Sequence, residues 1–143
     1  MTAASLQKEL VASDILAAIL ASLHVNKFTG DQEKIHTTLA RAKRHYPVLN
    51  AFSFSCGDVY PFSRQLEDAL SILQRSRMIR MENPDYDTYV LTPNGKVVGK
   101  EYVSVFEEAE QKQIKELAEI FEFECGIRDA EERSRTNGEM ASS

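Results

Sequence analysis

The sequence predicts a mainly α fold with a small β-hairpin. Apolar residues recur at helical spacing over most of the chain. Between residues 60 and 99, a helical pattern is followed by two short runs typical of strands and then by the start of another helix. A chain of 143 residues is long enough to bury one hydrophobic core and to carry an appended helix.

Composition narrows the class of protein. Hydrophobic residues make up 43% and charged residues 27% of the chain, which is ordinary for a globular protein and excludes a wholly disordered or fibrous one. No apolar run reaches the roughly 18 to 20 residues that a membrane span requires, so we expect a cytoplasmic protein without a membrane partner. Two cysteines are too few for a zinc site, and Cys56 is expected to be buried.

Two helices are predicted in the first third of the chain. The first is capped by Ser5 and ends near His24, and residues 25–30 form a turn. Asp31 or Thr29 caps the second, which stops before Pro47. Its last turn is basic, which either complements the helix dipole or contacts phosphate; the residues are Arg41, Lys43, Arg44 and His45.

A third helix follows a long connection in which residues 52–55 alternate like a short strand. A simple helix-turn-helix joins its helices by about three or four residues, so this chain departs from that motif. The third helix opens at Pro61 or Ser63. One buried stripe is expected, formed by Leu66, Ala69, Leu70 and Leu73.

Residues 78–81 and 89–91 are predicted to form the hairpin, closed by a turn-forming segment at residues 83–87. Thr92 then caps a last helix with Pro93 at its first position. Gly95 and Gly99 each cost about 1 kcal/mol relative to alanine, so its regular part is expected to begin near Lys100.

The last helix carries an apolar stripe on a rod rich in glutamate. The stripe either folds back on the first helix or pairs with a second copy of the chain, and we favour a homodimer. The residues expected to form the dimer contact are Val103, Phe106, Ile114, Leu117 and Phe121.

The order of helices and strands is that of a winged helix, with the hairpin as the wing. We therefore predict a winged-helix domain over residues 1–100 and a C-terminal helix, a candidate dimerisation element, over residues 101–124. A disordered tail is expected over residues 125–143, which have almost no apolar content.

Two segments resemble known families. The run YVLTPNGK at residues 89–96 is similar to the wing-to-helix junction of MarR-like and PadR-like regulators, which implies a dimeric transcription factor. The run YPFSRQLEDALSILQRSRMI at residues 60–79 resembles SocA-like antitoxin and prophage-associated domains. It departs from their pattern at Tyr60 and at Arg77 or Met78, where glycines are expected. That resemblance implies a protein that binds another protein.

Charge is unevenly distributed along the chain. The net charge is −5, which argues against attraction of the whole surface to DNA. Residues 30–80 carry eight basic and five acidic side chains, a net charge of +3, whereas residues 101–124 carry two lysines and eight glutamates, a net charge of −6. A locally basic surface thus lies apart from an acidic C-terminal helix.

Two functions are compatible with this pattern. The first is a DNA-binding regulator that uses the third helix and the residues flanking the wing, namely Arg64, Gln65, Ser71, Gln74, Arg75, Arg80 and Lys96. Glu67 and Asp68 count against it, because carboxylates repel phosphate. The second is a protein-interaction module that docks through its acidic helix. No catalytic, metal-binding or cofactor motif occurs, and we expect no enzyme.

Overall fold

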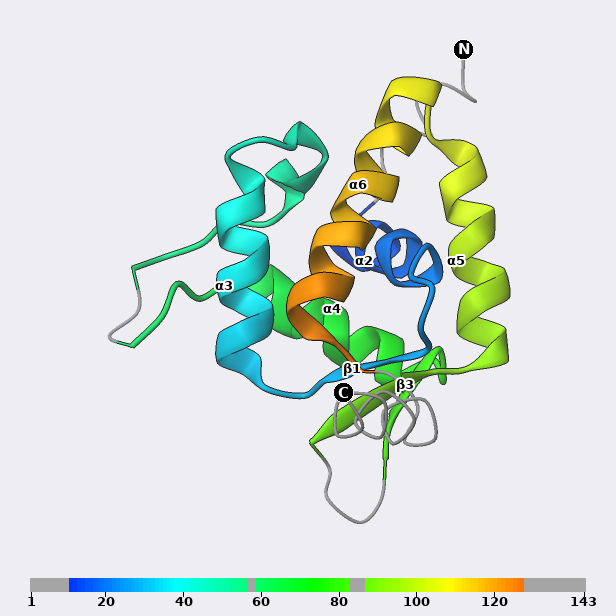
Figure 1. The fold of residues 1–143 in the computed structure, drawn as a ribbon, viewed down its shortest axis with the longest axis horizontal. Coiled ribbons are helices and arrows are strands. Elements are labelled where there is room, and N and C mark those ends of the chain that lie inside the picture. The colour runs from blue at the N-terminus through cyan, green and yellow to red at the C-terminus, as the bar shows by residue number, and fades with distance from the viewer. Residues whose placement is uncertain (1–10, 57–58, 83–86, 128–143) are drawn as a thin grey trace, which may run out of the picture.

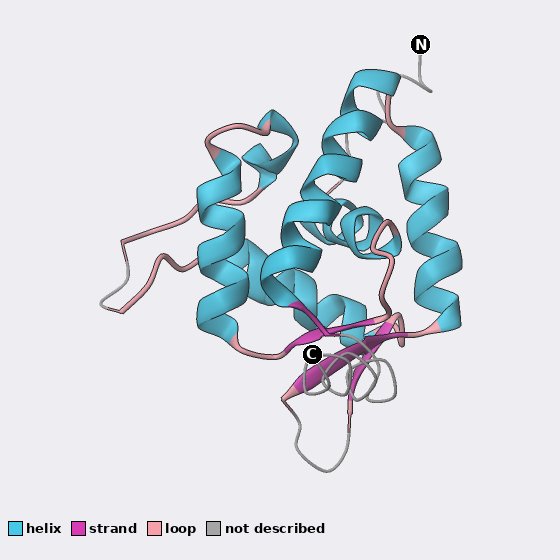
Figure 2. Cartoon of the chain, viewed as in Figure 1, coloured by secondary structure: helices cyan, strands magenta, loops and turns pink. Residues whose placement is uncertain are grey.

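The computed structural model describes residues 11–56, 59–82 and 87–127 and has a mainly helical α+β fold (Figures 1 and 2). The α-helices of these residues are α2 (Ala12–Ala21), α3 (Gln32–Lys43), α4 (Arg64–Arg75), α5 (Pro93–Val105) and α6 (Glu108–Cys125). A 3-10 helix, η1 (Pro47–Ala51), follows α3. The strands are β1 (Lys27–Thr29), β2 (Ile79–Met81), β3 (Thr88–Leu91) and β4 (Gly126–Ile127).

The strands form one antiparallel sheet in the order β2-β3-β1-β4, at one end of the helices (Figure 2). The predicted hairpin is confirmed, because Ile79 pairs with Leu91 and Met81 with Tyr89. Its turn at residues 83–86 lies outside the described part of the chain. The prediction of a simple turn at residues 25–30 is wrong, since β1 lies there and pairs with both β3 and β4.

The core lies between the helices and one face of this sheet. From Ile15 to Ala21, α2 is at most 5% exposed, and the predicted stripe on α4 is buried as expected. The aromatic ring of Phe28 on β1 stacks on Tyr89 with centroids 5.1 Å apart and meets Phe121 of α6 edge-on at 5.5 Å. Aromatic contacts of this kind tie the sheet to α6.

Three predicted helix starts are confirmed by their hydrogen bonds. The Asp31 carboxylate accepts from the backbone N–H groups of Glu33 and Lys34. The hydroxyl oxygens of Ser63 and Thr92 accept from Leu66 N–H at 3.2 Å and Gly95 N–H at 3.0 Å. Each cap satisfies backbone donors that have no partner inside the helix.

The prediction that regular helix begins near Lys100 is wrong, because α5 begins at Pro93. A Cβ added at Gly99 would lie 2.5 Å from both the Ala17 carbonyl oxygen and the Ala21 Cβ. Glycine therefore lets α5 approach the small residues of α2, and this packing offsets its low helix propensity.

The expected single C-terminal helix is in fact two. The chain is extended at Phe106 and Glu107 and reverses there, so that α6 runs back past α2 (Figure 1). A boundary at residue 100 thus falls inside α5.

The apolar stripe of the last helices lies in the chain's own core. Phe106, Ile114, Leu117 and Phe121 are at most 9% exposed, and Val103 packs against them. This is the fold-back arrangement, and a second copy cannot contact these four side chains without opening the core. The homodimer itself stays a prediction.

Several smaller expectations differ from the structure. In place of a strand at residues 52–55, there is one isolated bridge between Ser55 and Phe62. Cys56 is exposed and Cys125 is the buried cysteine, so the expectation for Cys56 is wrong.

The predicted disordered tail is wrong at its start, because Cys125 is the buried last residue of α6 and residues 126–127 form β4; residues 128–143 lie outside the described part of the chain. The predicted first helix begins at Ala12, after the extended residue Val11, and Ser5 itself lies outside the described residues. Among the described helices, none is both long and apolar enough to cross a bilayer.

Candidate functional site

The exposed face of α4 holds most of the predicted DNA-binding residues. Ser63 caps the helix, and its buried apolar stripe turns the polar side chains outward. All five predicted side chains of α4 are exposed, as is the side chain of Arg80 on β2; the five are Arg64, Gln65, Ser71, Gln74 and Arg75. The structure therefore brings together six of the seven predicted residues on α4 and the strand that follows it.

The first turn of α4 is occupied by contacts within the chain. The side-chain oxygen of Gln65 accepts from the Ser53 N–H and from the Ser63 hydroxyl, each at 3.1 Å. Arg64 Nε lies 3.7 Å from an Asp68 carboxylate oxygen, and both side chains are largely exposed. With Glu67 exposed beside them, this end of α4 offers little positive charge.

The other end of α4 is basic and has an unusual backbone. Arg75, Arg77 and Arg80 are exposed, and none of them belongs to an ion pair among the residues that the structure describes. Arg77 has φ 62°, while Arg77 N–H bonds to the Gln74 carbonyl and Met78 N–H to the Leu73 carbonyl. These bonds form a Schellman cap, whose left-handed position is usually glycine. Arginine there costs about 1 kcal/mol.

The start of α4 is tied to α3 by His36, a residue that the sequence analysis did not single out. His36 is fully buried, its Nδ1 accepts from Ser63 N–H at 3.1 Å, and its ring stacks on Phe62 at 4.8 Å. Burial lowers the pKa of His36, against a smaller raising effect of Glu67. The imidazole is therefore neutral and carries its proton on Nε2, which has no partner among the described residues.

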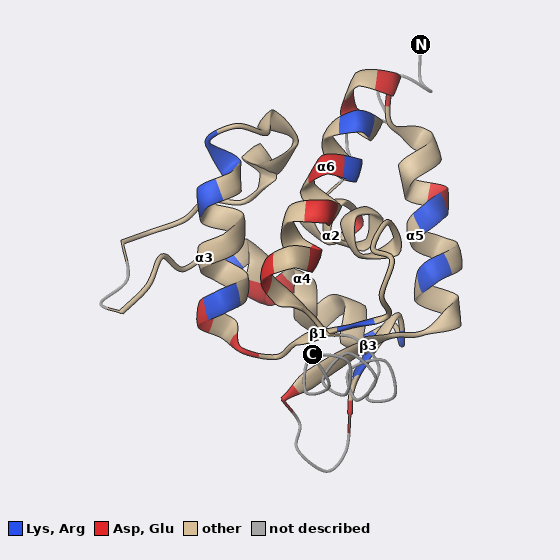
Figure 3. Ribbon diagram, viewed as in Figure 1, with Lys and Arg blue, Asp and Glu red and all other residues tan. Residues whose placement is uncertain are grey.

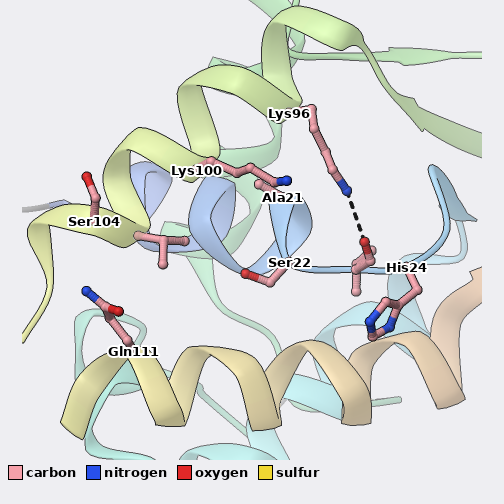
Figure 4. A pocket seen from close by; sticks show the side chains of 9 residues that line it. Ala21, Ser22, His24, Lys96, Lys100, Ser104 and Gln111 are labelled. Atoms are coloured by element: carbon pink, nitrogen blue, oxygen red, sulfur yellow. Dashed lines mark hydrogen bonds between the residues drawn. The ribbon is translucent and has the colours of Figure 1, made fainter. Parts of the chain in front are cut away.

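The seventh predicted residue, Lys96, does not join this face. Its ammonium group donates to the Leu23 carbonyl at 3.1 Å and lines a cleft between α2, α5 and α6 (Figure 4). Burial and the charge of Lys100 lower the pKa of Lys96, whereas Glu122 raises it. No residue of α4 lines this cleft.

The last two helices differ in their balance of charge. Acidic side chains recur along α6 and outnumber its two lysines, whereas α5 carries Lys96 and Lys100 against one glutamate (Figure 3). At the hairpin, Lys27 Nζ lies 2.9 Å from a Glu82 carboxylate oxygen, so these two charges offset each other. In the described residues, no group of three or more His, Cys, Asp or Glu side chains is arranged to hold a metal ion.

Comparison with protein-family models, with curated proteins and with solved structures found no match for this chain.

Proposed function

We propose that this protein is a non-enzymatic winged-helix protein that binds double-stranded DNA through α4 and the following strand. The order α2-β1-α3-α4-β2-β3, with β1 beside β3, supports the fold assignment. In such a scaffold, the helix before the hairpin is presented to the major groove and its polar face contacts the duplex.

The arginine cluster at the end of α4 is the observation that carries this proposal. Arg75, Arg77 and Arg80 are exposed within six residues of the chain, where no acidic residue intervenes. Arg77 holds a position at which glycine would be more stable. A strained backbone that retains a cationic side chain is typical of a binding surface.

The geometry shifts the expected contact from the first turn of α4 to its end. Gln65 is engaged with Ser53 and Ser63, and Arg64 faces Asp68. We therefore assign phosphate contact to the arginine cluster, and readout of bases to Ser71 and Gln74. We do not include Lys96 in the DNA-binding surface, because it lines the separate cleft between α2, α5 and α6.

The test is fluorescence anisotropy with labelled genomic duplex fragments at 50 and 200 mM salt. Binding at the lower salt concentration should weaken steeply at the higher, because each neutralised phosphate releases counterions. Arg77→Gly is the decisive variant: it should raise the free energy of unfolding by about 1 kcal/mol while weakening DNA binding. Loss of binding thus cannot be attributed to loss of folding.

Lys115→Gln on the exposed face of α6 is the matched control, since it removes one positive charge away from α4. It should leave the affinity within about twofold. The proposed function would be excluded if the protein did not bind DNA at 50 mM salt, or if Lys115→Gln and Arg77→Gly lost equal amounts of DNA affinity.

A protein partner is the second candidate. Phe123 is 86% exposed on α6 between two glutamates, an arrangement suited to a basic surface with an apolar pocket. Deleting everything after Gly99 would expose the core, so the test is a pull-down with Phe123→Ser. Unchanged recovery of partners would exclude this surface, and light scattering of the same sample tests the predicted homodimer.

A further inference from the structure

The cleft that holds Lys96 is an open site of its own. It has a volume of about 570 Å³, within the range of small-molecule sites. α5 lies on one side of the cleft and α6 with Gln111 on the other, and the end of α2 with the turn after it lies between them (Figure 4).

One end of the cleft is cationic. Lys96 and Lys100 lie one helical turn apart on α5, where like charges repel. Lys96 gives one N–H to the Leu23 carbonyl and keeps two, while Lys100 forms no ion pair among the described residues. Two ammonium groups this close favour a ligand that bears two negative charges.

Glu122, the carboxylate that raises the pKa of Lys96, forms no ion pair with either lysine of the cleft. Glu122 Oε1 accepts from the His24 backbone N–H at 2.6 Å and lies 3.6 Å from the His24 ring nitrogen Nδ1. The imidazole of His24 adds a further polar group at this end of the cleft.

The cleft also presents two hydroxyl oxygens, one from Ser22 at the end of α2 and one from Ser104 on α5 (Figure 4). The Ser22 hydroxyl donates to the Ala18 carbonyl at 2.9 Å, and the Ser104 hydroxyl donates to the Glu101 carbonyl at 2.6 Å. Their hydrogens are occupied, so both oxygens offer lone pairs to a ligand. Hydroxyl groups on the ligand are the natural donors to them.

We propose that this cleft binds a small phosphate monoester that carries hydroxyl groups. The phosphate dianion lies between Lys96 and Lys100, and the ligand hydroxyls donate to Ser22 and Ser104. The carbon skeleton contacts the apolar part of the lining, namely Ala21, Leu23 and Val103.

The test is calorimetric titration of the full chain, without DNA, with glycerol 3-phosphate, inorganic phosphate and glycerol. Glycerol 3-phosphate should bind more tightly than inorganic phosphate, and glycerol should not bind. Because DNA is absent, the result is independent of the proposed function.

Three variants separate the parts of the site. Lys100→Gln changes an exposed side chain and should lower the affinity for glycerol 3-phosphate at least tenfold. Lys115→Gln, the control, should leave this affinity within about twofold of the parent value. Ser104→Ala should lower the affinity for glycerol 3-phosphate and leave the affinity for inorganic phosphate unchanged. Circular dichroism confirms that each variant is folded.

Three outcomes would overturn the proposal. The first is no heat of binding with glycerol 3-phosphate up to millimolar concentration. The second is an equal loss in the Lys100 and Lys115 variants, which would mean unspecific attraction. The third is equal affinity for inorganic phosphate and glycerol 3-phosphate, which would remove the role of the hydroxyl groups.

Discussion

Replacing Gly99 by alanine tests how closely α2 and α5 pack. Alanine is favoured over glycine inside a helix by about 1 kcal/mol, so helix propensity alone predicts a more stable protein. In the structure, the new methyl group would lie 2.5 Å from the Ala17 carbonyl oxygen and 2.5 Å from the Ala21 Cβ. Carbon atoms normally meet at about 3.5 to 4.0 Å. Neither neighbour is the end of a flexible side chain, so the two helices must separate.

The expected magnitude follows from these opposing effects. Overpacking of a core costs about 1 to 3 kcal/mol, and two hard contacts place Gly99→Ala in the upper half of that range. After the gain in helix propensity is subtracted, the free energy of unfolding should fall by about 1 to 2 kcal/mol. The corresponding fall in Tm is about 3 to 8 °C for a domain of this size.

Urea denaturation followed by circular dichroism measures this change. Val97→Ala is the control, because Val97 lies on the same helix and is 58% exposed; it should stay within about 0.5 kcal/mol of the parent protein. If Gly99→Ala unfolds at the same or a higher urea concentration than the parent while the control is neutral, the close approach of α2 and α5 is refuted.

Three further outcomes are expected. Burial lowers the pKa of His36 below 6.5, so the unfolded chain takes up this proton first and stability is lost as pH falls below 6.5. His36→Gln keeps an acceptor for Ser63 and should show a smaller loss of unfolding free energy between pH 7.5 and 5.5; an unchanged loss would contradict this. Burial raises the pKa of the Cys125 thiol to about 11, so a thiol reagent at pH 8 should label only the exposed Cys56 in the native protein and both cysteines in urea. Thr92→Ala should cost about 1 kcal/mol by removing the cap of α5, whereas Thr92→Ser should cost far less, and equal urea midpoints for the two would exclude the cap.

Local sequence signals predicted the middle of the fold well. The stripe on α4, its Ser63 cap and the strands of the hairpin all depend on residues close together in the chain. Hydrophobic spacing and capping chemistry are local properties, so a single sequence carries them.

Elements that depend on distant partners were missed. β1 has only three residues and is a strand because β3 and β4 flank it. The start of α5 was misplaced because the penalty for Gly99 can be read from one residue, whereas its benefit depends on Ala17 and Ala21 of another helix.

Some features of the candidate site could likewise be predicted from the local sequence, and others depend on distant segments. The outward direction of the α4 side chains follows from helical spacing and was predicted. The contact that occupies Gln65, and the one that withdraws Lys96 to Leu23, come from segments far away in sequence. The buried role of His36 had no signal beyond its position next to Ile35 on the apolar side of α3.

The central place of β1 in the sheet has a consequence for synthesis. Lys27 pairs with Ile127 and Phe28 pairs with Gly126, partners that are made 100 and 98 residues later. Until the ribosome has released that stretch, one side of β1 keeps free backbone donors and acceptors, and Phe28 lacks the ring of Phe121. A nascent chain that stalls within α6 therefore exposes an unpaired edge of β1, to which another chain can pair. Synthesis of residues 126 and 127 covers that edge.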